Sequence, residues 1–230
     1  MMPRTIEPHD PRVESPWDRR LRFAALVVGR LGLGYLFLTQ LFWKMPPAFG
    51  CGQDADGRFV FTTASADGAL TRGSGLCDWI GIEAVAAKSE RVFLAADVDN
   101  DGHPELSVDL GPVVRANGAF LETVVMPNLA WFGWVVFLME ALIAASMLLG
   151  LVTRLGALVA LALSLQLLVG LGGYWNPGAD VQEWEWSYHL MALVSVILLC
   201  LAPGRVLGLD AWLRPRLGYG RLSRAIRALT

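Results

Sequence analysis

The chain has few charged residues. Asp, Glu, Lys and Arg make up 17% of its 230 residues, against about 25% in an average soluble domain. The net charge is only −2, and the chain has only 3 histidines and 3 cysteines. It also has no phosphate-binding loop, no dinucleotide fingerprint and no zinc-protease motif. We therefore expect no nucleic-acid partner, no nucleotide chemistry and no haem held by two histidines.

The chain contains long apolar runs with almost no charged residues. Hydrophobic residues make up 54% of the chain, and the mean hydropathy is +0.46. Four runs reach the roughly 20 residues that cross a bilayer: residues 23–44, 127–151, 155–174 and 186–203. Several of the 9 tryptophans fall near the ends of these runs, as in the aromatic belts of membrane proteins. The sequence predicts an all-α membrane protein, a bundle of four transmembrane helices.

Lys and Arg placement predicts the orientation of these spans. Basic residues concentrate in residues 1–22, in the turn around Arg154 and in residues 204–230. We expect both tails to be cytoplasmic, and residues 45–126 and 175–185 to lie outside, in a bacterial or archaeal plasma (inner) membrane. Residues 204–230 combine Leu with Arg, which suits either an amphipathic segment on the inner leaflet or an ordinary basic tail.

Residues 45–126 are too many for a simple connection. Strand-like runs fall at 59–63, 91–96, 106–110 and 119–125, with a helical run at 78–88. They predict a small β-rich extracytoplasmic insert between the first two spans. Cys51 and Cys77 both belong to it, and on the oxidising side of the membrane we expect them to form a disulfide.

An acidic loop inside the insert suggests a calcium site. Alternating carboxylates followed by Gly102 form a tight turn that gathers oxygen ligands around a hard cation. The twelfth position of the loop is Val108, so the bidentate Glu of an EF-hand is missing, and the loop resembles the DxDxDGxxD/E type instead. The expected ligands are Asp97, Asp99, Asp101, the carbonyl of His103, and Glu105. An acidic hairpin turn without metal is the alternative.

Polar residues inside the spans suggest a second site. Glu140 interrupts an apolar run, and a charge at mid-membrane costs about 2.5–3.5 kcal/mol, so it usually faces a bundle interior. A rise of about 1.5 Å per residue places Arg30, Tyr35, Gln166 and His189 in much the same layer. We expect Arg30 and Glu140 to pair. That pair either fixes helix register, or belongs with His189 to a proton-carrying site where Tyr35 and Gln166 bind a quinone head group.

The second half of the chain also resembles a known family. Glu140, the following LLGLVTRLGAL and the closing APGRVLGLD resemble motifs of the DoxX/DoxD-like membrane proteins. The corresponding residues after Glu140 are Gly150, Thr153, Arg154, Gly204, Arg205 and Asp210. The resemblance covers the four spans but not residues 45–126. It implies a four-helix membrane bundle, and some members are subunits of thiosulfate:quinone oxidoreductase while others associate with redox enzymes.

Three functions remain open from the sequence. The first is a quinone-facing integral membrane subunit of a respiratory, photosynthetic or sulfur-oxidising redox complex, with membrane lipid and other membrane subunits as partners. The second is a non-catalytic accessory subunit that stabilises a larger complex through a calcium-braced outer insert. The third, a small transporter, is less favoured because four spans with one charge pair would need to dimerise to form a path.

Overall fold

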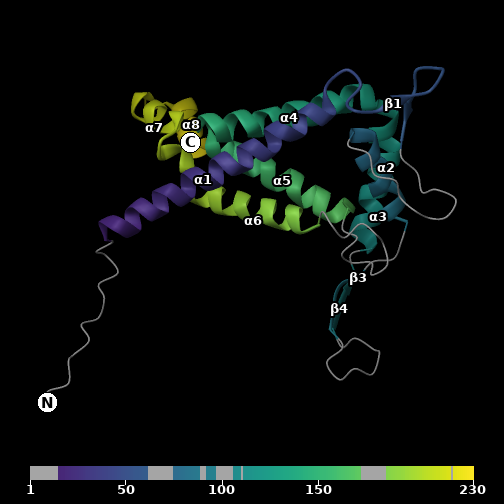
Figure 1. The fold of residues 1–230 in the computed structure, drawn as a ribbon, viewed down its shortest axis with the longest axis horizontal. Coiled ribbons are helices and arrows are strands. Elements are labelled where there is room, and N and C mark those ends of the chain that lie inside the picture. Colours follow the sequence, from purple (N-terminus) through teal and green to yellow (C-terminus); the bar gives the residue numbers. More distant parts are fainter. Residues whose placement is uncertain are drawn as a thin grey trace, which may run out of the picture.

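The bundle predicted from the apolar runs forms an elongated body of four long helices. The computed structural model describes residues 15–61, 75–88, 92–96, 106–109, 111–171, 185–218 and 220–230. Its long helices are α1 (Pro16–Leu41), α4 (Leu129–Leu149), α5 (Thr153–Leu171) and α6 (Glu185–Leu201). Helix α1 packs along α4, and α5 lies between α4 and α6 (Figure 1). The short strands and helices α2 (Leu76–Ala86) and α3 (Gly111–Phe120) lie at one end, and α7 (Leu209–Leu213) and α8 (Arg221–Leu229) lie at the other.

Local sequence explains where these helices begin and end. Helix α1 starts at Pro16, and the Ser15 hydroxyl accepts a hydrogen bond from the Asp18 N–H at 3.1 Å, as an N-cap does. Helix α4 ends at Gly150, whose φ of 65° is the left-handed conformation that terminates helices. Gly34 lets α1 approach α4 closely, because a Cβ there would lie 2.9 Å from the Cβ of Met147.

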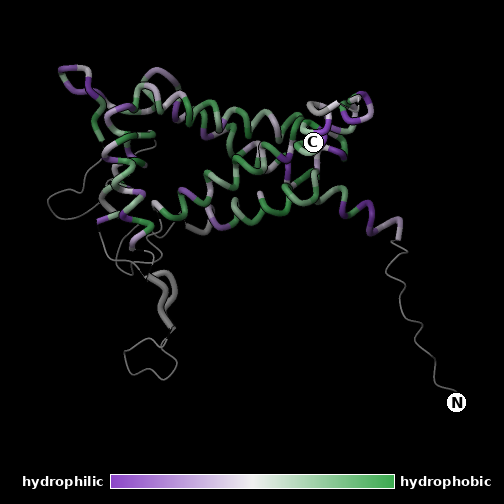
Figure 2. Tube along the Cα trace, turned by 180° about the vertical axis from the view of Figure 1, so that it is seen from behind, coloured by the Kyte–Doolittle hydropathy of each residue, from purple (hydrophilic) through white to green (hydrophobic). Residues whose placement is uncertain are grey.

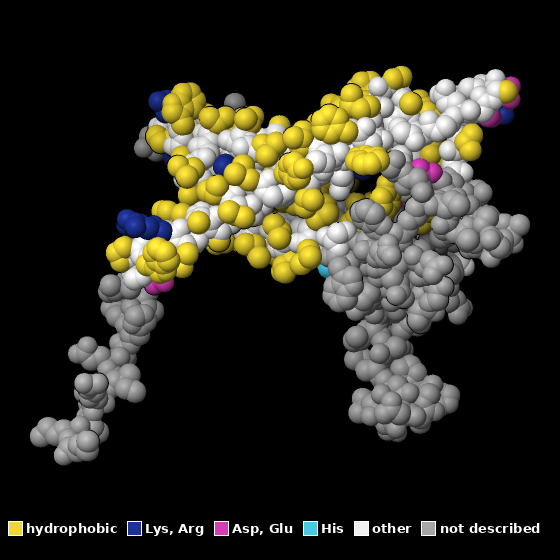
Figure 3. All heavy atoms as spheres, viewed as in Figure 1, with side chains coloured by type: hydrophobic (Ala, Val, Ile, Leu, Met, Phe, Trp, Pro, Cys, Tyr) yellow, Lys and Arg dark blue, Asp and Glu magenta, His cyan; other side chains and the backbone are white. Residues whose placement is uncertain are grey.

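The outward faces of the bundle are apolar. Val28, Leu138 and Leu190 are all more than half exposed, and hydrophobic colour follows the long helices in Figure 2, while hydrophobic side chains cover the visible flanks in Figure 3. Within the described residues, three helical stretches are long and apolar enough to cross a membrane: Pro16–Lys44, Gly111–Leu149 and Thr153–Gly170; Ser187–Leu201 is shorter. Helices that are apolar all round belong in a bilayer.

The segment between α1 and α4 mixes short strands with helices. Strand β1 (Gly52–Gln53) pairs antiparallel with β2 (Phe59–Val60), and β3 (Val92–Ala96) pairs antiparallel with β4 (Leu106–Asp109). Helix α2 (Leu76–Ala86) precedes β3, and α3 (Gly111–Phe120) follows β4; both helices pack against α5. The described part of this segment is therefore less rich in strands than expected.

The strand expected at residues 119–125 is wrong, because this stretch is helical. Helix α3 runs into a π-helical turn, Leu121–Val125, and then a 3₁₀ turn, Met126–Asn128, that leads into α4. Val114, Leu121, Val125 and Leu129 are buried. Their spacing of four and seven residues places them on one face of a helix, so the stretch packs as a helix despite its β-branched residues.

The expected disulfide is confirmed. Cys51 and Cys77 are bonded, with their Cα atoms 5.3 Å apart. The bridge joins the chain that leaves α1 to the start of α2. It lies in a small apolar core that includes Phe49, Ile80 and Leu129, so this end of the molecule has its own packing as well as its cross-link.

Candidate functional site

A large open cavity lies between the long helices and α2. Its volume is about 1170 Å³, more than the roughly 300–1,000 Å³ of most small-molecule sites. Its walls come from α1, α4, α5 and α6 together with α2 and α3, and they are mainly apolar, as at Phe37 and Met191. A few polar side chains interrupt them: Thr39, Gln40, Lys44, Glu83, Asn117, Glu140, Gln166 and Ser187. An apolar chamber with few polar groups is typical of a site for an amphipathic ligand.

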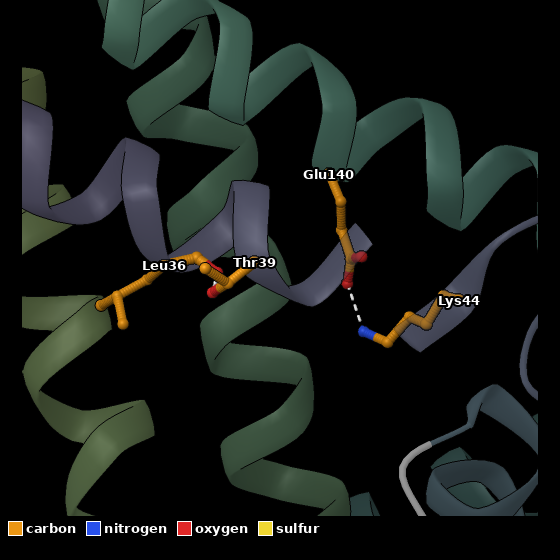
Figure 4. Close-up of polar contacts among 4 residues, drawn as sticks. All are labelled: Leu36, Thr39, Lys44 and Glu140. Atoms are coloured by element: carbon orange, nitrogen blue, oxygen red, sulfur yellow. Dashed lines mark hydrogen bonds and ion pairs between the residues drawn. The ribbon is translucent and has the colours of Figure 1, made fainter. Parts of the chain in front are cut away.

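Glu140 on α4 forms a buried ion pair with Lys44. The Lys44 Nζ lies 2.5 Å from Glu140 Oε1, and the two side chains are only 10% and 3% exposed. Figure 4 shows Lys44 reaching toward Glu140 from beyond the end of α1. Lys44 ends the 3₁₀ turn Phe42–Lys44, which directly follows α1, and its side chain is buried. The pair satisfies the charge of a carboxylate that would otherwise be strongly destabilising in this position.

The second carboxylate oxygen of Glu140 has no hydrogen-bond partner in the described part of the chain, although it is buried. Buried polar atoms nearly always have partners, so such an atom needs an explanation. Thr39 does not supply one, because its hydroxyl donates to the Leu36 carbonyl of its own helix at 2.8 Å (Figure 4). This oxygen is free to accept a hydrogen bond from a bound molecule.

Glu83 is a second buried carboxylate in the same cavity. It projects from α2 and is 3% exposed. Its Oε2 accepts hydrogen bonds from Gln166 of α5 at 2.7 Å and from Asn117 of α3 at 3.0 Å. Gly170 leaves room for this carboxylate, since a Cβ there would lie 2.1 Å from Glu83 Oε2. Three helices thus converge on one acidic group.

Of the polar residues expected in one membrane layer, some line the cavity and the others lie elsewhere in the structure. Glu140 and Gln166 both line the cavity. Arg30 does not pair with Glu140: it donates to the Leu207 carbonyl at 3.2 Å, toward the α7 end of the bundle. Tyr35 is 62% exposed on the outside of α1. His189 is half-buried and, within the part of the chain that is described, is not among the cavity-lining residues. Similar depth did not imply contact, because it leaves rotation about each helix axis undetermined.

Sequence reasoning did not assign to this site the ion-pair partner Lys44 or the second carboxylate Glu83 and its partner Asn117. Glu83 carried a usable signal, because it is a lone acid in an apolar helical run, WIGIEAVA. Lys44 fits the end of the opening helix that the family resemblance implies, but that placement gave it no role in the site. Its position depends on the 3₁₀ turn that follows α1, and the residue pattern gave no sign of that turn.

The expected calcium ligands Asp97, Asp99, Asp101, His103 and Glu105 lie outside the described residues. Where the structure does describe the chain, no group of three or more His, Cys, Asp or Glu side chains could hold a metal ion.

The motif residues after α4 form a joint at the other end of the bundle. Asp210 is fully buried and accepts hydrogen bonds from the N–H of Val152 at 2.7 Å and from the N–H and hydroxyl of Thr153 at 3.0 and 2.8 Å. The Asp210 N–H donates in turn to the Gly150 carbonyl at 2.8 Å. Asp210 thereby caps the start of α5 from a distant part of the sequence, and the joint fixes how α4, α5 and α7 meet.

Comparison with known families agrees with these features. A family model described as "TQO small subunit DoxD" matches residues 112–228, which is 117 of the 230 residues. The chain belongs to the DoxD family. It is an integral membrane protein, as its apolar helices indicate. No curated protein and no solved structure matches it. The matched region of this DoxD protein contains Asn117, Glu140 and Gln166 but begins after Lys44 and Glu83.

Proposed function

We propose that this DoxD protein is a quinone-facing membrane subunit of a redox complex. The family is described as a small subunit of TQO, so members of it act beside other subunits. The cavity supplies the second support, because its apolar walls and few polar groups suit a quinone, which joins a polar ring to an apolar tail.

The observation that carries the proposal is the partly satisfied carboxylate of Glu140 beside Lys44. The Lys44 ammonium has three N–H donors and so can donate to a quinone carbonyl while it holds Glu140. The partnerless oxygen of Glu140 can accept a hydrogen bond from a quinol hydroxyl. One charge pair thus offers complementary contacts to the oxidised and reduced forms of the same ring.

We also propose a topology in which α1, α4, α5 and α6 all cross the membrane and both tails are cytoplasmic. Lys and Arg gather at the start of α1 and around α7 (Leu209–Leu213) and α8 (Arg221–Leu229), at one end of the molecule (Figure 3). The disulfide lies at the opposite end, which suits the oxidising side. Residues 45–126 would then be the extracytoplasmic insert.

The acidic loop remains a proposed calcium site. Strands β3 and β4 pair, so residues 97–105 connect two antiparallel strands rather than the two helices of an EF-hand. Calcium bound by Asp97, Asp99, Asp101, Glu105 and the His103 carbonyl would brace this hairpin. The proposed role is structural, because such a calcium ion would hold the connection between two paired strands.

The direct test is purification from native membranes in a mild detergent, followed by solvent extraction and binding of a short-chain quinone. Quenching of tryptophan fluorescence reports binding, since Trp43 and Trp79 line the cavity. We expect bound quinone and saturable quenching, with affinity reduced at least tenfold in E140Q. The exposed acid Glu122 provides the matched control E122Q, which should bind normally.

Other outcomes assign other functions. A stable multi-subunit complex without quinone would overturn the quinone-facing role and favour the accessory subunit. A homo-oligomer that binds no quinone would favour the transporter. Full activity of E140Q with native partners would exclude a proton-carrying role for Glu140.

A further inference from the structure

The cavity extends well beyond the Lys44–Glu140 pair. Gln40 and Gly29 both lie on α1 and both line the cavity, although they are eleven residues apart, which is about 16 Å at the rise of an α-helix. From Leu36 to Gly29, the residues of α1 that line the cavity are Leu36, Leu33, Gly32 and Gly29. The cavity thus has polar groups toward one end and an apolar length that continues from them along α1.

Helices α1 and α6 form two edges of this apolar length. They come close at Gly29, where a Cβ would lie 3.7 Å from Leu198 Cδ2, an ordinary van der Waals distance. In Figure 1 the two helices diverge from the α7 end of the molecule toward the α2 end. The divergence leaves part of the cavity between them, which we call the α1–α6 seam. The residues of this seam are Gly32, Leu36, Leu190 and Val194.

The α1–α6 seam reaches the surface of the protein. Leu36 is 46% exposed and Leu190 is 59% exposed, although both line the cavity. A Cβ at Gly32 would have no atom of the described structure within 4 Å, so this glycine borders open space. Side chains that line a cavity and are also exposed mark an opening. Because the outward faces of these helices are apolar, the opening faces hydrocarbon in the proposed topology.

We infer that the α1–α6 seam holds the apolar tail of the quinone and lets that tail extend into the bilayer, while the ring lies near Lys44 and Glu140. The inference rests on the proposed function, because it places a second part of the same ligand. The shape of the cavity indicates this occupant. Polar groups at one end suit a polar ring, and the apolar opening that continues from them suits a chain attached to that ring.

An open seam makes the site tolerant of tail length. A closed cavity would reject a tail longer than its walls allow, because overpacking is destabilising. At an opening into the bilayer, the part of the tail beyond the seam stays among lipid chains, which are as apolar as leucine side chains. The site should therefore recognise the quinone ring and the first part of its tail, and accept long tails as well as short ones.

The test compares three ligands on the full-length protein at one detergent concentration. They are a benzoquinone ring without a tail, the same ring with a decyl tail, and the same ring with a long isoprenoid tail. Tryptophan quenching reports binding, because Trp43 and Trp79 line the cavity. The wild type should bind all three ligands.

A phenylalanine at position 32 should separate the tail from the ring. In Gly32→Phe the added side chain occupies the α1–α6 seam, so affinity for the two tailed quinones should fall about tenfold or more. The tail-less ring should bind as it does to the wild type. The matched control is Leu31→Phe, which places the same side chain one residue away, at a position that is 40% exposed and is not among the described residues lining the cavity. It should bind all three ligands normally.

A second variant covers the case in which Gly32→Phe does not fold. Gly32→Leu has a higher helix propensity than the wild type at this position, and its side chain still enters the seam. It should also weaken the binding of the tailed quinones while the tail-less ring binds normally.

The two proposals fail in different ways. Wild-type protein that binds the tail-less ring but rejects the tailed quinones would overturn the role of the seam and leave the quinone site standing. Folded Gly32 variants that bind the tailed quinones as tightly as the wild type, or that lose all three ligands equally, would do the same. Wild-type protein that binds none of the three ligands would overturn the proposed function and this inference with it.

Discussion

Replacement of Lys44 by Met should sharply destabilise the protein. The change leaves Glu140, which is 3% exposed, as a buried charge without its ion-pair partner. Breaking a buried pair by removal of one member costs about 3–5 kcal/mol. In a chain of this size, each kcal/mol lowers the melting temperature by about 2–4 °C, so K44M should melt roughly 6–20 °C below wild type. Thermal unfolding in detergent, followed by circular dichroism, measures the change.

The double variant K44M/E140Q separates the charge from the packing. With both charges gone, no buried ion is left uncompensated, so much of the lost stability should return. The chain offers its own control in Lys88 and Glu122, a pair of the same chemistry 3.0 Å apart but 69% and 45% exposed. The corresponding cycle there should give a coupling of about 0–1 kcal/mol. Equal coupling energies in the two cycles would refute the claim that Lys44 and Glu140 form a desolvated pair.

Three further predictions concern the rest of the fold. Asp210→Ala removes the acceptor of three hydrogen bonds at the joint after α4 and should cost about 3 kcal/mol, seen as a lower melting temperature; a wild-type melting curve would contradict that role. Reduction of the Cys51–Cys77 bridge should cost about 3 kcal/mol in thermal unfolding and weaken quinone binding, whereas C200S should change neither. Calcium should raise the melting temperature of the full chain, and D99N should abolish this rise. A melting temperature that is the same with and without calcium would exclude the metal site.

Composition was sufficient to predict most of the scaffold. Long apolar runs must become helices in a bilayer, because only internal hydrogen bonds can satisfy their backbone there. The pairing of Cys51 with Cys77 followed from their shared segment and the absence of other candidates in it. The helical form of residues 119–125 was missed, because a short apolar run with β-branched residues fits a strand or a buried helix equally well.

The candidate site was only half predictable, and its residues show why. Glu140 and Gln166 could be found because polar groups in an apolar run are costly and need a polar environment. Which residue neutralises Glu140 depends on helix rotation and on the 3₁₀ turn that carries Lys44. Arg30 had a suitable depth but faces the joint near Leu207 instead. Depth along the membrane normal does not determine the rotation or the lateral position of a helix, so it cannot predict which side chains touch.

The location of Lys44 and Glu83 also bears on the role of the segment between α1 and α4. Both residues precede the region that matches the DoxD family. Both line the cavity together with Glu140, which lies within that region. The disulfide joins Cys51, seven residues after Lys44, to Cys77, six residues before Glu83. A cross-link in that position limits how far Lys44 and Glu83 can move apart. It follows that the segment between α1 and α4 completes the cavity, so its removal should abolish ligand binding even where the four long helices still fold.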